Sequence, residues 1–304
     1  KISIPDLSAV ITERLAQNYE AQTASVVVLL SEGKIKNHVE AGDDVAVILN
    51  VTPFYAEGGG QVGDTGYMIA PYGKLEVNSV KRLADGTVFH VAQVVEGTIS
   101  TGDAVKLVVD LARRDHISRN HTATHLLHAA LKQVLGTHVN QAGSYVGPDR
   151  LRFDFSHFAS VSAEELAAIE SIVNSAILSN TGVGVIETSQ ETAKEMGATA
   201  LFGEKYGEKV RVIVIGDVSK ELCGGIHVAS TGCIGLFRII SESSVGAGLR
   251  RIEAVTGYNA LDYVKTRESI LGNAAHVLKT RPEDILSKVE SLLEQVKGLE
   301  REVA

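Results

Sequence analysis

Two short motifs carry side chains that bind metal ions. His121 and His125 lie in the segment HTATH, and Cys223 and His227 lie in CGGIH. Residues four positions apart on a helix share one face, so the first pair can reach a single ion. Together the motifs offer three imidazoles and one thiolate, which is a full ligand set for tetrahedral zinc or a three-ligand catalytic site with a spare ligand. Either motif alone is a weak signal, but the two together predict a zinc site and chemistry at it.

The residues around the first motif narrow that chemistry. A zinc metalloprotease has Glu directly after the first histidine of such a helix, where it acts as the general base. Thr122 occupies that position, which disfavours a protease or a small-amide hydrolase. His128 lies on the same helix face about one turn further along, and we expect it to pack or to cap rather than to bind the ion.

A glycine-rich segment, YAEGGGQVGDTG, spans residues 55–66. It lacks the Lys-Ser/Thr ending of a nucleotide-binding P-loop, which argues against phosphate binding of that kind. One interpretation is a hairpin whose glycines adopt positive φ. Another is a backbone surface close to a polar ligand, with Gln61 projecting into the site. The sequence leaves both interpretations open.

The composition is that of an ordinary globular protein, with 44% hydrophobic and 22% charged residues in a chain of 304. This length allows two domains with their own cores. The sequence has no apolar run of about eighteen residues, so we expect no membrane span. The formal net charge of −8 argues against indiscriminate nucleic-acid binding but leaves room for a local basic patch.

Only two cysteines are present, Cys223 and Cys233, which are too few for a disulfide framework. We expect a cytoplasmic protein in which Cys223 is a ligand and Cys233 is a small buried hydrophobic residue. The chain begins with Lys1 rather than Met and ends within a helical pattern. We therefore expect it to be a fragment of a longer protein.

Arginines gather in groups along the chain. They are Arg113, Arg114 and Arg119 near the first motif, Arg150 and Arg152 before a strand, and Arg238, Arg250 and Arg251 near the last strands. Many charged side chains only solvate a surface. A subset close to a zinc site would suit a phosphodiester substrate, because guanidinium groups bind phosphate oxygens in a forked geometry.

The apolar periodicity changes along the chain and predicts its domains. Residues 1–23 are predicted to form a helical linker, and residues 24–110 contain short β-rich runs that predict a small β-barrel or sandwich. Over residues 111–257, a long helix that ends at Gly136 is followed by interleaved strands and helices, which predicts an α+β domain. Residues 258–304 form a helical tail.

The tail has apolar residues in alternating steps of four and three. They are Ile285, Val289, Leu292, Val296, Leu299 and Val303. This spacing is typical of a heptad seam and predicts the start of a coiled coil. It fits equally well with one amphipathic helix packed on its own domain.

Segments quoted in chain order resemble one known family. They are FYAEGGGQVGDTG, RNHTATHLLHAALKQVLGTHVNQAGS, LRFDFSH, ALFGEKYGEKVRV, ELCGGIHV and IGLFRIISESSVGAGLRRIEAVTG. They are similar to the editing domain of bacterial alanyl-tRNA synthetases over about residues 25–258, and the tail resembles the start of that family's C-terminal helical region. The sequence departs from the family pattern at Gly58 and Ile226, where Ser and Thr are common. These departures bear on fine substrate discrimination.

The resemblance implies a fold and an activity. The fold is a small β-barrel-like subdomain, then a zinc-containing α+β editing core, then the start of a helical or coiled-coil region. The activity is hydrolysis of the ester in Ser-tRNA(Ala) and, more weakly, in Gly-tRNA(Ala), with Zn2+ as cofactor. The longer parent would attach alanine to tRNA(Ala) using ATP, although the motifs for that reaction have no counterpart in this chain.

The resemblance also implies roles for individual residues. The zinc ligands are the four residues of the two motifs, and Gln61, Thr122 and Thr124 contact the substrate. The partner is the acceptor end of a mischarged tRNA(Ala), and the helical tail supports a homodimer. Weak tRNA contacts are expected from Arg119, Arg152, Arg250 and Arg251.

Two alternatives stay open at this point. One is a free-standing trans-editing deacylase, since such proteins share the same core. The other is a non-catalytic, zinc-stabilised module that binds tRNA or dimerises through the tail. In the second case, loss of Cys223 should unfold the domain rather than leave it folded and inactive.

Overall fold

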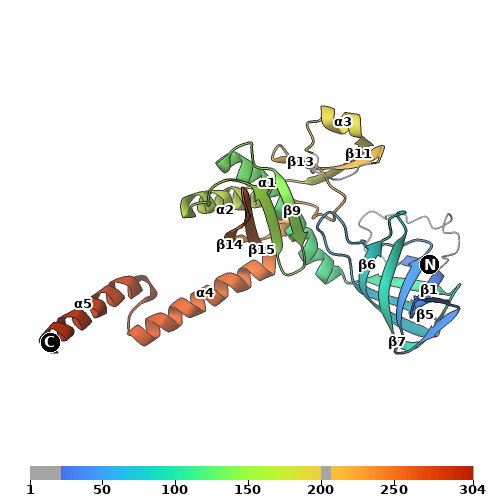
Figure 1. The fold of residues 1–304 in the computed structure, drawn as a ribbon, viewed down its shortest axis with the longest axis horizontal. Coiled ribbons are helices and arrows are strands. Elements are labelled where there is room, and N and C mark those ends of the chain that lie inside the picture. Colours follow the sequence, from blue (N-terminus) through green and yellow to red (C-terminus); the bar gives the residue numbers. More distant parts are fainter. Residues whose placement is uncertain (1–21, 200–206, 304) are drawn as a thin grey trace. The chain divides into compact units, whose positions relative to one another are not determined.

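The computed structural model describes residues 22–199 and 207–303. The helix predicted over residues 1–23 therefore lies outside the described residues, except for its last two positions, which belong to strand β1 (Gln22–Ser31) instead. The chain divides into two compact units, Lys1–Gly257 and Tyr258–Ala304. Each unit is described by itself, with its elements labelled in Figure 1.

The first unit begins with a closed antiparallel β-barrel of six strands. Their order around the barrel is β1, β4 (Asp44–Leu49), β7 (Val88–Ser100), β6 (Gly73–Arg82), β5 (Gly66–Ala70) and β8 (Ala104–Val109), and β8 pairs with β1 to close it. The short strands β2 (Lys34–Lys36) and β3 (His38–Glu40) pair with β1 and β7. Of the two predicted arrangements, barrel and sandwich, the barrel is confirmed, and its strands lie within the β-rich residues 24–110 except for the first two positions of β1.

Alternation of side chains explains why these runs close around one core. Along β5, Gly66, Met68 and Ala70 are buried while Tyr67 and Ile69 are exposed. Successive side chains of a strand point to opposite faces, so one face fills the interior and the other meets solvent. The barrel has an apolar core in which Leu29, Met68, Leu75, Ile99 and Leu107 are at most 1% exposed.

The rest of the first unit is an α+β arrangement. The helices are α1 (Leu111–Leu135), α2 (Ala163–Leu178) and α3 (Gln190–Glu195), with a short 3-10 turn at Thr231–Ile234. One sheet has the order β14 (Phe237–Gly246), β15 (Leu249–Thr256), β10 (Leu151–Ser156) and β9 (Gln141–Val146). The other has the order β11 (Val183–Ser189), β12 (Lys209–Ile215) and β13 (Ser219–Leu222).

Helix α1 links the barrel to this second part and carries the first metal-binding motif. It begins after Asp110, whose side chain accepts a hydrogen bond from the backbone N–H of Arg113, and it ends before Gly136, as predicted. Leu127 and Leu131 are fully buried in a core shared with α2 and the strands. Side chains on other faces of the same helix, including His121 and Thr122, are buried although they are polar. A helix buried all round must satisfy these polar groups internally.

The glycine-rich segment forms a hairpin that leaves the barrel and reaches β9. Gly58 and Gln61 exchange backbone hydrogen bonds across Gly59 and Gly60, which have φ of 57° and 79°. Two residues with positive φ are what a tight hairpin turn requires. The first interpretation of this segment is therefore confirmed. A Cβ on Gly60 would lie 2.6 Å from the carbonyl oxygen of Ser144 in β9, so glycine also permits the close approach.

One prediction about packing is wrong. Cys233 is exposed rather than buried, because the 3-10 turn that contains it faces solvent at Gly232 and Cys233 while Thr231 and Ile234 supply the buried side chains. Over residues 22–199 and 207–303 we find no helix that is long and apolar enough to cross a membrane.

The second unit is helical, as predicted for the tail. It contains α4 (Gly257–Leu278), a short 3-10 turn at Pro282–Asp284 and α5 (Ile285–Val303). No residue of α5 is buried, and its seam residues Val289, Leu292, Val296 and Leu299 are each at least 36% exposed. The seam is thus a continuous apolar stripe, and its pairing in a coiled coil stays a prediction.

Candidate metal centre

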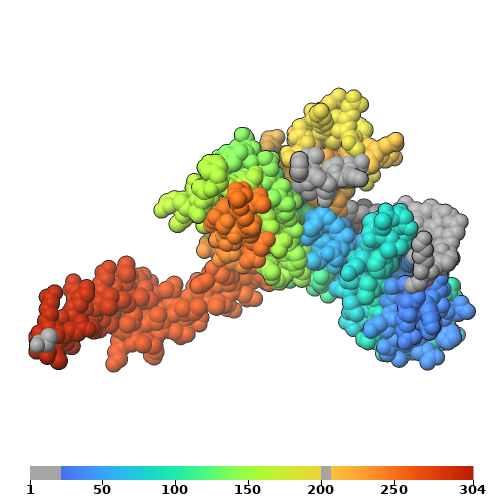
Figure 2. All heavy atoms as spheres, viewed as in Figure 1, coloured from blue at the N-terminus to red at the C-terminus, as the bar shows by residue number. Residues whose placement is uncertain are grey.

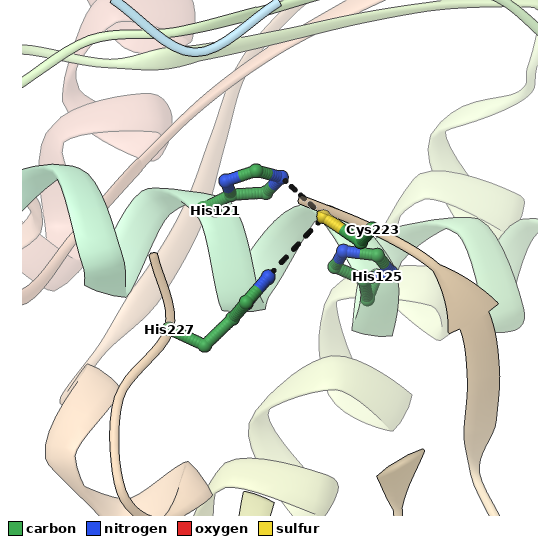
Figure 3. A group of neighbouring side chains, drawn as sticks. All are labelled: His121, His125, Cys223 and His227. Atoms are coloured by element: carbon green, nitrogen blue, oxygen red, sulfur yellow. Dashed lines mark hydrogen bonds between the residues drawn. The ribbon is translucent and has the colours of Figure 1, made fainter. Parts of the chain in front are cut away.

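The structure brings the four predicted ligands together. One ligand atom from each of His121, His125, Cys223 and His227 lies within 4.8 Å of the others. Figure 3 shows the first two on helix α1 and the other two on the segment that follows β13. The Sγ atom of Cys223 lies 3.3 Å from Nε2 of His121 and 3.3 Å from Nε2 of His227. Two motifs about a hundred residues apart therefore form one cluster.

Gln61 fixes the orientation of the first histidine. Its Oε1 atom accepts a hydrogen bond from the backbone N–H of Ile226 (2.9 Å) and lies 2.7 Å from Nδ1 of His121. A backbone N–H can only donate, so the atom of Gln61 at this position must be the oxygen, and Nδ1 of His121 must donate to it. The Nε2 atom of a neutral His121 then keeps its lone pair, directed at the cluster.

Thr122 fixes the orientation of His227. Its hydroxyl donates to the carbonyl of Ser118 (2.9 Å), accepts from the backbone N–H of Val228 (3.2 Å) and lies 3.1 Å from Nδ1 of His227. The one hydroxyl hydrogen goes to Ser118, so Nδ1 of His227 must be the donor. The tautomer leaves Nε2 of His227 ready to bind a metal ion.

The second histidine faces a carboxylate. Nδ1 of His125 lies 2.8 Å from Oε2 of Glu221, and both side chains are less than 9% exposed. Burial lowers the pKa of His125, but the charges of Glu221 and Cys223 outweigh burial and raise it to about 10. Burial raises the pKa of Glu221, and the neighbouring His125 and His128 then bring it far below its usual range. Glu221 is therefore an ionised partner of His125.

The pKa values of Cys223 and His227 are both lowered, although burial acts on them in opposite directions. Burial raises the pKa of the Cys223 thiol, yet His121 and His227 hold it well below its ordinary value. Burial lowers the pKa of His227 to about 3, against the attraction of Cys223. The thiolate of Cys223 and the neutral imidazole of His227 are forms that bind metal, whereas His125 would release its proton when an ion binds.

The loop that carries the second motif depends on close packing and on one arginine. A Cβ atom on Gly225 would lie 1.8 Å from Cε1 of His121, so a larger residue would force the loop or the imidazole ring to move. Nη1 of Arg211 donates to the carbonyls of Cys223 (3.2 Å) and Gly225 (2.5 Å). The hydrogen bonds of Arg211 tie the loop to strand β12, and the close packing of Gly225 brings it against His121 of helix α1.

A cavity of about 260 Å3 opens beside the ligands. In Figure 2 the light-blue segment around residues 52–64 lies between the teal barrel strands and the green atoms of α1 and β9. The cavity is lined by this segment and by both parts of the unit. Its polar side chains are Thr52, Tyr55, Glu57, Arg82, His121, Thr124, His125, Gln141, Ser144 and Glu221, with Cys223 in the wall.

The residues predicted to contact substrate occupy different places. Thr124 lines the cavity, while its hydroxyl donates to the carbonyl of Asn120 (2.8 Å). Gln61 and Thr122 are fully buried and do not line the cavity. They hold the metal-ligating histidines instead.

The arginines predicted to contact tRNA are engaged within the protein. Arg250 forms a forked pair with Glu242 and Arg251 a forked pair with Asp154. Arg152 lies 3.7 Å from Asp154, and Nε of Arg119 donates to the carbonyl of Cys233. The strands that carry Arg152, Arg250 and Arg251 thus present charge pairs, and Arg119 of helix α1 is held by a backbone carbonyl.

Sequence reasoning missed three residues that the structure places at the site. They are Glu221 beside His125, Arg211 beneath the loop, and Arg82 in the cavity wall. The position of Glu221, two residues before Cys223 on a short strand, is a signal that was available. A strand residue next to a metal ligand is a natural place for a carboxylate that supports a histidine. Arg82 and Arg211 have no comparable local signal.

The donor set fits a borderline metal ion such as zinc. Three imidazole nitrogens and one thiolate converge, and each histidine has an oxygen atom at its Nδ1. Oxygen partners at Nδ1 are the usual support for histidines that bind metal through Nε2. Among the described residues this is the one cluster of its kind.

Comparison with known proteins first defines the class. Residues 3–113 match the family model of tRNA synthetases class II (A). Residues 210–253, which include the CGGIH motif, match the model of the threonyl and alanyl tRNA synthetase second additional domain. The chain therefore carries sequence of class II tRNA synthetases.

Individual relatives narrow the class to one family. The chain is 52% identical to the alanine–tRNA ligase of Desulforamulus reducens over 280 residues, which is 92% of this chain and 32% of that protein. The values are 51% identity, 93% and 32% for the enzyme of Bacillus thuringiensis subsp. konkukian, and 49%, 96% and 33% for that of Acetivibrio thermocellus. The chain is thus similar to alanine–tRNA ligases over nearly its whole length, and it spans about a third of the length of these curated relatives.

Proposed function

We propose that this chain hydrolyses the ester bond of tRNA(Ala) mischarged with serine and, more weakly, with glycine. The observation that carries the proposal is the cavity whose wall contains three residues of the metal cluster, His121, His125 and Cys223. The supporting context is about 50% identity to alanine–tRNA ligases, which by their name join alanine to tRNA. A cavity with a metal site in a tRNA synthetase relative suits removal of an amino acid better than its activation.

The chemical step adds water to the ester carbonyl carbon and breaks the bond to the ribose oxygen, which releases free serine and a tRNA 3′-hydroxyl. Zn2+, held by His121, His125, Cys223 and His227, would supply a positive charge that orients the ester and the water. Thr124 is our candidate for contact with the aminoacyl group, because it lines the cavity. Gln61 and Thr122 act on the reaction through the histidines they hold.

The proposed reaction would correct errors that arise because binding alone discriminates poorly between alanine, glycine and serine. A pocket for alanine cannot strongly reject glycine or serine, because such small differences are worth only about 1–3 kcal/mol. A second site can require a hydroxyl, so that the correct alanyl ester leaves a buried polar group unpaired. We propose that the polar wall of the cavity plays this role.

The remaining parts of the proposal concern partners. The acceptor end of tRNA would enter past Arg82, whose guanidinium can bind a phosphate. Arg119, Arg152, Arg250 and Arg251 would contribute weak contacts, since each is already engaged within the protein. We further propose a cytoplasmic protein that pairs through α5, and a longer parent that attaches alanine to tRNA(Ala) with ATP.

The test is deacylation of Ser-tRNA(Ala), Gly-tRNA(Ala) and Ala-tRNA(Ala) by the wild type and a Cys223→Ala variant. Cys233→Ala is the matched control, because that cysteine is exposed and outside the cluster. We expect rapid hydrolysis of the seryl ester, slower hydrolysis of the glycyl ester, and loss of both only in Cys223→Ala. A zinc-loaded, folded wild type that leaves the seryl ester intact would overturn the proposal.

One observation favours a second candidate function, a non-catalytic zinc module that binds tRNA. All four cluster residues converge, and closed four-ligand sites are typical of structural zinc. This candidate predicts that Cys223→Ala unfolds the chain, whereas the hydrolase predicts a folded and inactive protein. Circular dichroism and thermal unfolding of the variant separate the two.

A further inference from the structure

We propose that Glu221 and His128 are positioning residues that together fix the metal ligand His125. The inference rests on the proposed metal site, but not on the hydrolysis of any particular ester. Neither residue belongs to the ligand cluster. Their effect on the metal ion is therefore transmitted through His125.

The geometry forms a short chain of contacts. Oε2 of Glu221 lies 2.8 Å from Nδ1 of His125, and Oε1 of the same carboxylate lies 3.1 Å from Nδ1 of His128. The carboxylate is 8% exposed, and the two imidazoles are 6% and 3% exposed. His125 and His128 lie on consecutive turns of α1, while Glu221 comes from β13. One carboxylate thus bridges two turns of the helix.

The direction of these contacts follows from the geometry. The two carboxylate oxygens face the two Nδ1 atoms, as an ion-pair contact at His125 and as a hydrogen bond at His128, and an oxygen in this position accepts a hydrogen from the ring nitrogen. A hydrogen on Nδ1 of His125 leaves its Nε2 for the metal ion, which is the tautomer that coordination requires. Donation by His128 satisfies the second carboxylate oxygen, together with the hydroxyl of Ser219 at 3.2 Å. Without these donors to Oε1, we expect the carboxylate to rotate toward other hydrogen-bond donors and away from His125.

A second cavity explains how His128 can serve this role. Glu221 lines the cavity beside the cluster and also a separate cavity of about 410 Å3, which His128, Lys132 and Lys220 line as well. Among the described residues Nε2 of His128 has no hydrogen-bonding partner. The only polar contact of the His128 ring in this part of the chain is therefore the one to Glu221. A buried imidazole with a single partner is well suited to hold that partner in place.

The test measures zinc affinity by competition with a chromophoric chelator, together with the visible absorption of the Co2+-substituted protein. Glu221→Gln should weaken Zn2+ binding by about tenfold to a hundredfold, the range typical of partners of metal-bound histidines. His128→Leu removes a donor and should weaken binding less. His128→Asn places an amide N–H near the position of Nδ1 and should restore most of the affinity. His157→Asn, a buried histidine outside the cluster, should leave affinity unchanged.

A double-mutant cycle tests whether His128 acts through Glu221. We expect the loss caused by His128→Leu to shrink in the Glu221→Gln background, because the carboxylate it positions is gone. Equal losses in both backgrounds would overturn the proposal. So would unchanged Zn2+ affinity and unchanged Co2+ absorption in Glu221→Gln. Long-range 1H–15N spectra of the folded wild type add an independent readout, since His128 protonated at Nε2 rather than Nδ1 would also contradict it.

These outcomes separate this inference from the proposed function. If the wild type binds Zn2+ but cleaves no seryl ester, the proposed hydrolase function is contradicted and the positioning role of Glu221 and His128 is not. If the wild type cleaves the ester and Glu221→Gln binds Zn2+ with unchanged affinity, only the positioning role is contradicted. A Glu221→Gln protein that fails to fold leaves the decision to His128→Leu and its Asn counterpart.

Discussion

The two halves of the metal cluster are held in opposite ways. His121 and His125 lie on a helix of 25 residues whose backbone hydrogen bonds are internal. Cys223 and His227 lie on a loop whose backbone groups are bound by side chains from other elements, namely Arg211, Gln61 and Thr122. The helix half is placed by regular geometry, and the loop half is placed by tertiary contacts.

This difference shows where each half is vulnerable. A helix positions residues four apart without help, so its side chains need support only at the imidazole. A loop has no such ladder, and each buried N–H or C=O must find a partner elsewhere. Changes to residues outside the motifs should therefore disturb the loop half more than the helix half.

The largest effect is expected from Gly225→Ala. Its Cβ would overlap the ring of His121, so the loop and the helix half cannot both keep their positions. We expect Zn2+ affinity to fall by more than about a hundredfold, beyond the range for supporting residues. Chelator competition measures it. Gly182→Ala is the control, since a Cβ there meets no atom within 4 Å, and normal affinity in Gly225→Ala would contradict the packing argument.

Thr122→Val should lower stability next. The change removes the acceptor of both Val228 N–H and Nδ1 of His227, and a buried donor without a partner costs about 1–3 kcal/mol. Urea unfolding of the zinc-loaded protein measures the loss. Thr124→Val is the matched control, because that hydroxyl donates to Asn120 within the same helix. Equal losses in the two variants would mean that the contact to the loop is unimportant.

Arg211→Met should weaken the loop half alone. It removes the donor to the carbonyls of Cys223 and Gly225. We expect about a tenfold loss of Zn2+ affinity, with the helical circular dichroism signal preserved. Lys220→Met on the neighbouring strand serves as the control. If the helical signal falls along with affinity, the two halves are less separable than we describe.

The smallest effect concerns His90, a buried histidine of the barrel that belongs to neither half. Burial lowers its pKa to about 4, below the unfolded value of 6.5. The unfolded chain therefore takes up a proton first as the pH falls below 6.5, and stability is lost between 6.5 and 4. By about pH 5.5 the loss relative to pH 8 should be about 1 kcal/mol.

The measurement compares urea unfolding of the wild type and His90→Asn at both pH values. The metal cluster is common to the two proteins, so its own acid sensitivity cancels in the difference. The stability advantage of the wild type should shrink as the pH falls. A constant advantage would show that His90 is not the group responsible.

Sequence reasoning reached the barrel and the helix half for a shared reason. Short β-rich runs mark the strands, with alternating burial along β5, and His121 and His125 follow helical spacing inside a clear apolar period. Local periodicity is enough to predict both. The convergence of Cys223 and His227 on the same point rested on counting ligands, because the path of the CGGIH loop is set by Arg211 and Gln61.

The features that the sequence did not predict depend on tertiary contacts rather than on local periodicity. Gln61 was expected to face the substrate, but its place behind His121 depends on how the glycine hairpin meets β9. Cys233 was expected to be buried because cysteine usually is, whereas a local turn decides its exposure. Contacts between segments far apart in the chain leave no periodic trace in the sequence.

The single oxygen of Gln61 has a consequence for how the parts depend on one another. It comes from the hairpin that leaves the barrel, and it receives hydrogens from the helix half and from the loop half at once. Coupling free energies are reciprocal. If the docked hairpin strengthens metal binding by a certain free energy, then the bound metal ion stabilises the docked hairpin by the same free energy. Removing the ion should thus speed amide hydrogen exchange around residues 55–66, far along the chain from all four ligands.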